Sequence, residues 1–358
     1  MALPNRPGLT WLLNQGEHAK LRLSCPLIPG VRLLNMLRPD ACSRIIPGVE
    51  VKALMLLLAS LAAGACHAQD RGPIIDMHLH AFGFDAYGNP PPANEITGRI
   101  PAARSDEDAI RATLGEMQKH NIVLAVASGP LADVQRWTTA GAGKVIGGAY
   151  TGPRDPLPDV ATLRRLIIDK QIAVLGELGL QYRGLRPDDP QLAAYFALAD
   201  ELDVPVAVHT GLGDSGTPYA CCPKFRTSLG NPQAIEEVLV RHPRLRVSLM
   251  HAGYPYLAET KAILHIYPQV YVDIAVLNWS LPRAEFHAYL KALVDAGFAK
   301  RIMFGSDQMV WPEAIGQAIA GVEDADFLSF GQKRDIFYNN AATFLRLDQA
   351  TIDRHHGK

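Results

Sequence analysis

Two histidines spaced two residues apart, His78 and His80, end an apolar stretch that covers residues 73–80. In a β-strand, residues i and i+2 point to the same face, so both imidazoles would lie on one side. Two neutral imidazoles on one face can bind a divalent cation, and Asp76, which shares their parity, could orient one of them. The alternative is a buried strand that merely ends in histidines. The spacing alone leaves both interpretations open.

The elements that would position these residues repeat along the chain. From residue 74 onward, short apolar and β-branched runs alternate with amphipathic segments, a pattern typical of repeated βα units. The predicted strands are 74–80, 122–128, 145–151, 172–180, 204–211, 246–253, 270–276 and 302–308. Helices are predicted at 105–120, with Ser105 as N-cap, and at 232–242. Eight such units favour an α/β fold of the (β/α)8 TIM-barrel type, with a single catalytic domain, over an open doubly wound sheet.

Side chains that could bind a metal stand at the same end of five predicted strands. A barrel carries its chemistry at the C-terminal ends of its strands. The side chains found there are His78, His80, Glu177, His209, His251 and Asp307. The other histidines after residue 69 fall in or beside predicted helices or at the tail. Chance would place one or two histidines at strand ends, so four histidines with two carboxylates indicate a metal-binding active site.

The sequence around these residues resembles the amidohydrolase superfamily, in its amidohydrolase-related branch. The similar stretches are VHTG at 208–211, SLGNP at 228–232, HPRLR at 242–246, MHAG at 250–253, FGSD at 304–307 and NNAATFL at 339–345. The resemblance covers about residues 73 to 347. This branch holds lactone and amide hydrolases together with decarboxylases of the aminocarboxymuconate-semialdehyde type.

The resemblance implies a ligand set for one divalent metal, expected to be Zn²⁺. His78, His80, His209 and Asp307 would hold it, and His251 would stabilise a developing oxyanion or transfer a proton. A cation in such a site lowers the pKa of a water that it binds to about 7. Asp307 could then accept the proton as the water attacks a carbonyl. Asp307 and His251 are therefore the predicted catalytic residues.

Glu177 leaves the number of metals open. In branches with two metals, a carboxylate on strand four bridges them, and the histidines of strands five and six hold the second ion. Glu177, His209 and His251 could form such a binuclear centre. The other interpretation is that Glu177 orients an imidazole without bridging. We favour one metal.

The leading functional hypothesis is a metal-dependent hydrolase of an amide, ester or lactone bond. A non-oxidative decarboxylase of an unsaturated or aromatic acid is the nearest alternative, and a non-catalytic metal-binding barrel is an alternative of another class. No motif separates the first two. A binding protein has no need of an acid and a base beside the metal, which disfavours the third.

The substrate should lie among the loops that follow the strands, including the long loop 81–104. Cations and aromatic rings in these loops would suit a ring-bearing or unsaturated small molecule with a carboxylate. The predicted substrate residues are Arg183, Lys224, Arg226, Trp279 and Trp311. Ordinary charges on a solvated rim are an equally good explanation of each residue taken singly.

The first 68 residues are interpreted as a leader with a signal peptide. Residues 53–65 carry no charge and are too few to span a bilayer, which is typical of a signal h-region, and cleavage is expected after Ala68. Fifty residues precede this segment, so we expect the true start nearer to Val51 or Met36. The protein would be exported, periplasmic or secreted. Lipid anchoring through Cys66 is a less favoured alternative, because 63–65 match a lipoprotein signal poorly.

Composition supports a domain with a large core that acts on small molecules. The 358 residues are 48% hydrophobic and carry a formal net charge of −1, and residues 69–358 keep 28 basic against 33 acidic residues. This balance argues against nucleic acid as a partner. Cys221 and Cys222 are the cysteines left after the leader, and we favour free thiols over a disulfide between neighbours.

Overall fold

The computed structural model describes residues 71–358. The predicted leader, its apolar segment 53–65 and Cys66 lie outside the described residues. Export stays a prediction, which N-terminal sequencing of the protein from its host would refute if the terminus lay far upstream of Gln69. Within residues 71–358, no helix is both long enough and apolar enough to cross a membrane.

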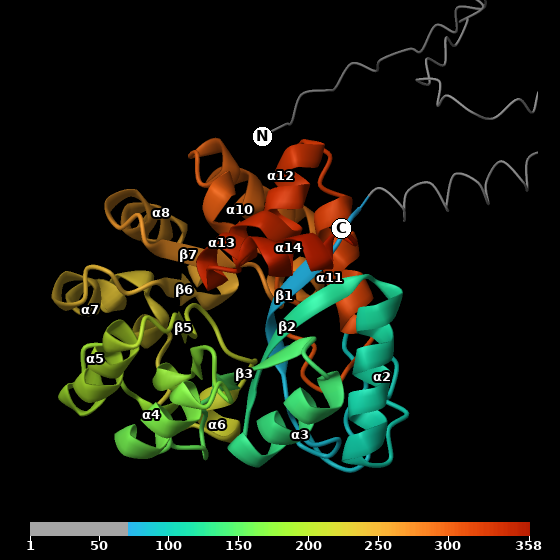
Figure 1. Ribbon diagram of the computed structural model, residues 1–358, viewed down its shortest axis with the longest axis horizontal. Coiled ribbons are helices and arrows are strands. Elements are labelled where there is room, and N and C mark those ends of the chain that lie inside the picture. Colours follow the sequence, from blue (N-terminus) through green and yellow to red (C-terminus); the bar gives the residue numbers. More distant parts are fainter. Residues whose placement is uncertain (1–70) are drawn as a thin grey trace, which may run out of the picture. The chain divides into compact units, whose positions relative to one another are not determined.

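Eight parallel strands form the centre of the described part, in the order predicted from the sequence (Figure 1). They are β1 (Ile74–His80), β2 (Ile122–Gly129), β3 (Val145–Ala149), β4 (Leu175–Leu178), β5 (Val206–Val208), β6 (Val247–Leu249), β7 (Val270–Asp273) and β8 (Ile302–Met303). Ladders join β1 to β3 in one sheet and β4 to β8 in another. Every ladder is parallel, as expected for repeated βα units.

Contacts at both seams connect the two sheets. Isolated parallel bridges pair Gly148 with Val174 and Thr151 with Leu178, between β3 and β4. At the other seam, the Met77 N–H donates to the Phe304 carbonyl at 2.9 Å, and the Asp307 N–H donates to the His78 carbonyl at 2.7 Å. The residues after β8 thus lie against β1, which confirms the predicted (β/α)8 architecture.

Helices surround the strands, as Figure 1 shows for α4, α5, α7, α8 and α10. The helices are α2 (Asp106–Lys119), α3 (Leu131–Gly141), α4 (Val160–Ile168), α5 (Ala193–Glu201), α6 (Thr217–Ala220), α7 (Glu236–Arg241), α8 (Leu257–Ile266), α9 (Leu277–Ser280), α10 (Arg283–Asp295), α11 (Ala314–Glu323), α12 (Phe330–Arg334), α13 (Asn340–Leu345) and α14 (Gln349–His355). The predicted cap of α2 is present, because the Ser105 side chain accepts from the Asp108 N–H. The predicted helix 232–242 begins as a 3₁₀ turn, Pro232–Ile235, before α7.

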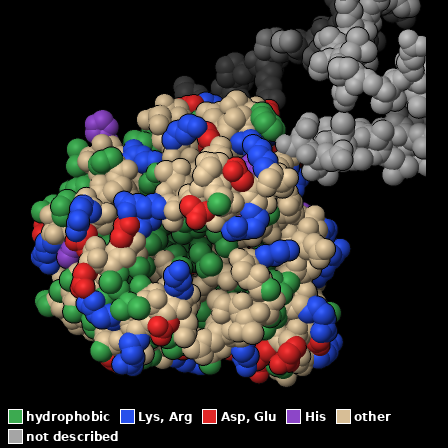
Figure 2. Space-filling model, in the orientation of Figure 1, with side chains coloured by type: hydrophobic (Ala, Val, Ile, Leu, Met, Phe, Trp, Pro, Cys, Tyr) green, Lys and Arg blue, Asp and Glu red, His purple; other side chains and the backbone are tan. Residues whose placement is uncertain are grey.

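Helix α13 lies at the N-terminal ends of β6 and β8. The Asn340 amide donates to the Ile302 carbonyl at 2.7 Å, and the Arg246 guanidinium donates to the Phe344 carbonyl. Figure 2 views this face and shows hydrophobic side chains in a hollow at its centre, with acidic and basic side chains interspersed around it. The chemistry predicted for the C-terminal ends of the strands therefore lies at the opposite end of the barrel.

Strands β6 and β8 are shorter than predicted, at three and two residues. For β6 the backbone explains the difference, since His251 (φ 57°) and Ala252 (φ 48°) adopt the left-handed conformation, which cannot continue a strand ladder. After β8, the Phe304 N–H donates to the Ile336 carbonyl at 2.8 Å, outside the strand ladders, and Asp307 (φ 50°) is again left-handed. The two predicted catalytic residues are thus in strained backbone just beyond their strands. Such strain is concentrated at functional sites in folded proteins.

Candidate metal centre and active site

The structure brings all six predicted metal-competent side chains together at the C-terminal end of the barrel. Each of them is buried. The closest approaches join His80 Nε2 to Asp307 Oδ1 at 3.0 Å and to Glu177 Oε2 at 3.3 Å. His78 Nε2 lies 3.6 Å from the same oxygen of Glu177 and 3.7 Å from Asp307 Oδ1. Residues more than 200 positions apart therefore converge on one small volume.

Backbone carbonyls fix the orientation of two imidazoles. His251 Nδ1 lies 3.0 Å from the Ala275 carbonyl, and His80 Nδ1 lies 3.3 Å from the Ser128 carbonyl. A carbonyl oxygen only accepts, so we assign the proton to Nδ1 in both rings. Nε2 then keeps its lone pair for a metal or a proton.

Glu177 is the member that connects the histidines. Its Oε2 faces His78 and His80, whereas its Oε1 lies 3.9 Å from His209 Nε2. Three groups of side chains could each bind an ion, because the ligand atoms within each group lie within 4.8 Å of one another. The groups are His78–His80–Glu177, Glu177–His209–His251 and His78–His251–Asp307, and they overlap because Glu177 and His78 each belong to two of them. This arrangement is compatible with one ion or two.

The local charge balance fits a bound cation. Among the described residues, Arg246 is the only buried lysine or arginine, and it lies at the other end of the barrel. Burial alone would lower the pKa of His78, but Asp307 and Asp273 outweigh burial and raise that pKa well above its usual value. Buried acids that hold a proton on a neighbouring imidazole so firmly would hold a divalent cation in its place.

The remaining ionisation states also suit metal ligands. Burial raises the pKa of Glu177, but the histidines around it outweigh that effect and bring the pKa down to about 2. Burial also raises the pKa of Asp307, but the charge of His78 and its neighbours outweighs burial, so the pKa of Asp307 is lowered. Burial and the charge of His251 lower the pKa of His209 to about 3. Two carboxylates and a neutral imidazole are thus available as ligands at neutral pH. His78 Nε2 and Asp307 Oδ1 are buried and have no hydrogen-bond partner, as expected of atoms that would bind a metal ion.

A network of hydrogen bonds positions the segment that carries Asp307. The Asp76 carboxylate accepts from the Ser306 N–H at 2.9 Å, the Asn278 amide donates to the Gly305 carbonyl at 2.9 Å, and the Gln308 amide donates to the His80 carbonyl at 2.8 Å. Asp76 also accepts from the His78 N–H at 3.1 Å, so it supports the cluster through backbone N–H groups and not by orienting an imidazole, as its parity had suggested. It acts through the backbone of the segment after β8.

The predicted substrate residues are arranged less uniformly than the cluster. Trp279 and Trp311 are buried, and their indole N–H groups donate to the Ser306 carbonyl at 2.7 Å and to the Pro92 carbonyl at 3.0 Å. The sequence predicts that these rings follow their strands but does not predict their orientation. In the structure, neither indole N–H donates to a residue of the cluster. Arg226 is exposed and donates to the carbonyls of its own loop. Contacts of these residues, and of Arg183 and Lys224, with a substrate stay predictions.

Three side chains near the cluster were not selected from the sequence. Asp273, at the end of β7, accepts from the His251 N–H at 3.0 Å and lies 3.5 Å from His78 Nδ1. The Tyr182 hydroxyl lies 3.1 Å from His209 Nε2, and the ring of Phe82 stacks on His80. The signal for Asp273 was present, since it is an acid at a strand end like the others. Nothing in the sequence pattern indicated the direction of the two aromatic rings.

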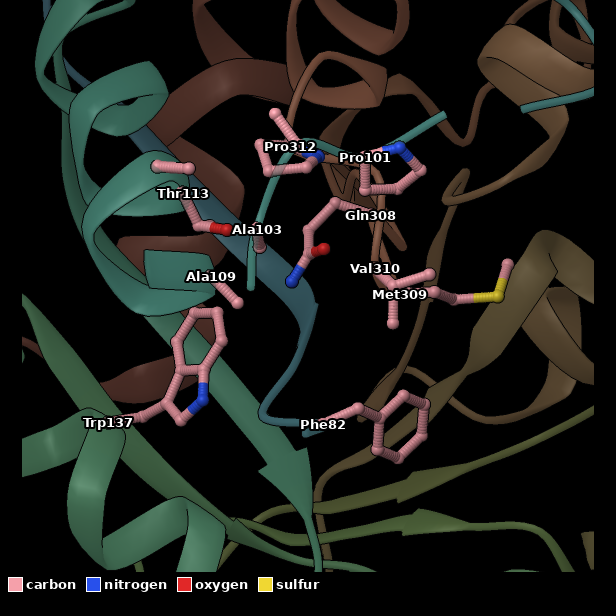
Figure 3. Close-up of a pocket in the computed structure, with 12 residues that line it drawn as sticks. Phe82, Pro101, Ala103, Ala109, Thr113, Trp137, Gln308, Met309, Val310 and Pro312 are labelled. Atoms are coloured by element: carbon pink, nitrogen blue, oxygen red, sulfur yellow. The ribbon is translucent and has the colours of Figure 1, made fainter. Parts of the chain in front are cut away.

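A small apolar cavity lies between α2, Phe82 and the segment after β8 (Figure 3). Its volume is about 60 Å³, and Phe82, Trp137, Gln308 and Val310 are among its lining residues. Pockets that bind small-molecule substrates usually measure several hundred Å³. This cavity is therefore too small for a substrate, although two of its lining residues, Phe82 and Gln308, contact His80.

Cys221 and Cys222 form a disulfide with each other, so the favoured prediction of free thiols is wrong. The two residues directly follow α6 in the loop after β5, where Cys221 is exposed and Cys222 is buried. Adjacency prevents the bond from connecting distant segments. It instead constrains the loop that carries Phe225, whose ring centroid lies 5.2 Å from that of Tyr182.

Comparison with known proteins agrees with this geometry. A family model described as amidohydrolase matches residues 75–347. The chain belongs to the amidohydrolase family. Members of this family are metal-dependent enzymes that act on small molecules, and both hydrolases and decarboxylases are among them. A stretch of 121 residues is 25% identical to Protein fluG of Emericella nidulans, and the match spans 34% of this chain but 13% of that protein.

Solved structures of low sequence identity share the fold of this amidohydrolase. A TIM-barrel protein of Bordetella bronchiseptica, Bb4693, is 20% identical with a TM-score of 0.58, over 80% of this chain and 100% of its own. A probable 2-pyrone-4,6-dicarboxylic acid hydrolase of Acinetobacter baumannii is 14% identical with a TM-score of 0.53, over 76% and 99%. The 5-carboxyvanillate decarboxylase of Novosphingobium aromaticivorans, which was solved with manganese, is 13% identical with a TM-score of 0.53, over 78% and 97%.

Proposed function

We propose that this amidohydrolase is a Zn²⁺-dependent hydrolase of an amide, ester or lactone bond. One observation carries the proposal: Asp307 is buried and ionised, its Oδ1 lies 3.0 Å from His80 Nε2, and that oxygen has no hydrogen-bond partner. Its carboxylate is thus free to bind an ion and to accept a proton. A reaction that removes a proton from an attacking water needs such a group.

The chain's own residues divide the remaining work. His78, His80, His209 and Asp307 would hold the ion, whose chemistry is to polarise the scissile carbonyl and acidify a water. His251, held through Nδ1 by the Ala275 carbonyl, presents Nε2 for a proton or an oxyanion. Asp273 keeps His251 in place through its backbone N–H. The donor set of imidazoles and carboxylates suits Zn²⁺, and it also suits Mn²⁺.

Decarboxylation of an unsaturated or aromatic acid is the second candidate. His251 favours it, because this ring lies in the cluster, 5.0 Å between centroids from His78, where a proton donor to carbon would be needed. In that reaction no water is deprotonated, so Asp307 would serve as a ligand only. The two candidates therefore make opposite demands on Asp307 and His251.

A pair of variants tests the choice. Metal-loaded Asp307→Asn and His251→Asn should be assayed on a panel of lactones, amides, esters and aromatic acids, with acid release and CO₂ scored separately. For hydrolysis, we expect Asp307→Asn to lose on the order of 10² to 10⁴ in turnover while retaining metal, the usual size of a general-base contribution. Near-normal turnover in Asp307→Asn together with an inactive His251→Asn would reject hydrolysis in favour of decarboxylation.

A further inference from the structure

A single carboxylate lies between two members of the cluster that belong to different strands. Asp273 ends β7 and is 1% exposed. Its Oδ1 accepts from the backbone N–H groups of His251 at 3.0 Å and Ala275 at 3.1 Å. Its Oδ2 lies 3.5 Å from Nδ1 of His78, on β1. The two oxygens of Asp273 therefore have different partners.

The contacts of Oδ1 fix the orientation of this carboxylate. His251 lies beyond the last ladder pair of β6, at Leu249, so its buried N–H needs an acceptor outside the sheet. Asp273 provides that acceptor. The same oxygen accepts from the Ala275 N–H, and the Ala275 carbonyl lies 3.0 Å from Nδ1 of His251. With Oδ1 bound to two backbone donors, Oδ2 is directed toward His78.

The contact of Oδ2 is with the nitrogen of His78 that faces away from the other acids. His78 Nε2 lies 3.6 Å from Glu177 Oε2 and 3.7 Å from Asp307 Oδ1, so the two ring nitrogens have separate carboxylate neighbours. Asp273 Oδ2 and His78 Nδ1 are both buried, and neither has another hydrogen-bond partner. Buried polar atoms are rarely left unpaired in folded proteins. Each of these two atoms provides the partner that the other lacks.

A glycine leaves room for this contact. Gly305 follows β8, in the segment that lies against β1. A Cβ at Gly305 would lie 2.7 Å from His78 Cβ and 2.9 Å from Ala275 Cβ. Because Gly305 has no side chain, the residues after β7 and the histidine of β1 can approach each other closely enough for Asp273 to reach His78.

We propose that Asp273 is a positioning residue that keeps a proton on Nδ1 of His78 and so reserves Nε2 for the metal. A carboxylate only accepts, so its pairing with Nδ1 requires an N–H there. Such a partner fixes both the tautomer and the ring orientation of a metal-binding histidine. The inference deepens the proposed function and rests on it for the role of His78 as a ligand. The position of the proton can be measured without a metal.

Replacement of Asp273 by asparagine tests the Oδ2 contact alone. The two backbone N–H donors require an oxygen at the Oδ1 position, so the NH₂ group of the asparagine must face His78 Nδ1. An NH₂ group only donates, so the ring would accept at Nδ1 and carry its proton on Nε2. We expect Asp273→Asn to bind zinc on the order of 10-fold to 100-fold more weakly than the parent in calorimetric titrations.

The ring proton of His78 is a readout that a merely structural role would not change. In protein with isotope-labelled histidine, NMR detects the Nδ1–H group, and its loss in His78→Ala assigns the signal. We expect this signal in the parent with and without zinc, because Nδ1 carries a proton in the Nδ1–H tautomer and in the doubly protonated ring. It should be absent in Asp273→Asn. Absence of the signal from the parent, or its persistence in Asp273→Asn, would overturn the proposal.

Asp76→Asn is the matched control. Asp76 is also buried, and its Oδ1 likewise accepts from two backbone N–H groups, those of His78 at 3.1 Å and Ser306 at 2.9 Å. Its Oδ2 has no hydrogen-bond partner in the described part of the chain. The control removes the same charge near His78 and should keep the Nδ1–H signal. Equal loss of the signal in both variants would show that buried charge alone holds the proton, and would count against a specific role of Asp273.

The two measurements separate this inference from the proposed function. If the parent binds no zinc while the Nδ1–H signal depends on Asp273, the metal chemistry of the proposed function fails and the positioning role stands. If the parent binds zinc but the Nδ1–H signal does not respond to Asp273→Asn, the inference fails and the metal centre stands.

Discussion

We expect Glu177 to determine how many ions the cluster binds. Its two oxygens face different histidines, with Oε2 3.3 Å from His80 Nε2 and Oε1 3.9 Å from His209 Nε2. A carboxylate placed in this way can bridge two ions or orient the ligands of one. The Tyr182 hydroxyl, at 3.1 Å from the same His209 nitrogen, already provides that ring with a partner. Because His209 would exchange this contact for a metal whether one ion or two are bound, the number of ions depends on Glu177.

Replacement of Glu177 by glutamine distinguishes these roles. We expect about one equivalent of zinc in both the parent protein and Glu177→Gln, with 10-fold to 100-fold weaker binding in the variant, the usual effect of removing a residue that supports metal ligands. Elemental analysis after dialysis against a zinc buffer measures both quantities. Two equivalents in the parent that fall to one or none in the variant would show that Glu177 bridges.

The sequence predicted the cluster residues because strand parity and strand ends are readable features. His78 and His80 alternate as strand residues must, and His209, His251 and Asp307 follow apolar runs. Residues that depend on side-chain direction were not predictable. Phe82 stacks on His80, and Tyr182 reaches His209 from a 3₁₀ turn, Leu180–Arg183, whose presence has no signature in hydrophobic periodicity.

At the scale of elements, the predicted catalytic groups stand on irregular backbone that follows short strands. The segment from Phe304 to Gln308 follows a two-residue strand and is held by hydrogen bonds to β1, Asp76, Asn278 and Trp279. The sequence predicted one strand over 302–308 because its residues are apolar up to Gly305. The left-handed φ of Asp307 depends on tertiary contacts, so it could not be predicted from local sequence propensity.

Gly305 lets this segment approach β1 closely. A Cβ at this position would lie 2.7 Å from His78 Cβ and 2.9 Å from Ala275 Cβ, so either the segment or His78 would have to move. We expect Gly305→Ala to destabilise the protein by about 1–3 kcal/mol, as overpacking does. Zinc affinity should fall by at least about 10-fold, since small displacements of ligands or their supporting groups have effects of this size.

A second glycine provides the control for this variant. Gly115 lies exposed in α2, and a Cβ there would meet no atom within 4 Å. Gly115→Ala should therefore stabilise the protein by about 0.5–1 kcal/mol without changing zinc affinity. Denaturant unfolding and calorimetric zinc titration measure both effects. Equal zinc affinity in Gly305→Ala and the parent would contradict the role of close packing at β8.

At the scale of the whole molecule, the barrel concentrates negative charge at one end. Asp76, Glu177, Asp273 and Asp307 are all buried there, and the only buried arginine of the described part lies at the other end. Burying several acids with only imidazoles as basic partners is costly, and a bound cation would offset that cost. From the fold and the charge distribution we therefore expect a bound metal to contribute to the stability of the protein.

Metal removal should consequently destabilise the folded protein. A ligand that binds only the folded state stabilises it by about 4 kcal/mol at a thousandfold excess over its dissociation constant. For a domain of this size, we expect chelation to lower the melting temperature by at least about 5 °C.

Two variants make this test specific for the cluster. Added zinc should restore the melting temperature of the parent protein but not that of His78→Ala. The control variant His265→Ala, which changes an exposed histidine of α8, should respond like the parent. Calorimetric melts with and without chelator, at one protein concentration, measure these differences. Identical melting of the parent protein in both conditions would mean that the buried acids do not hold an ion.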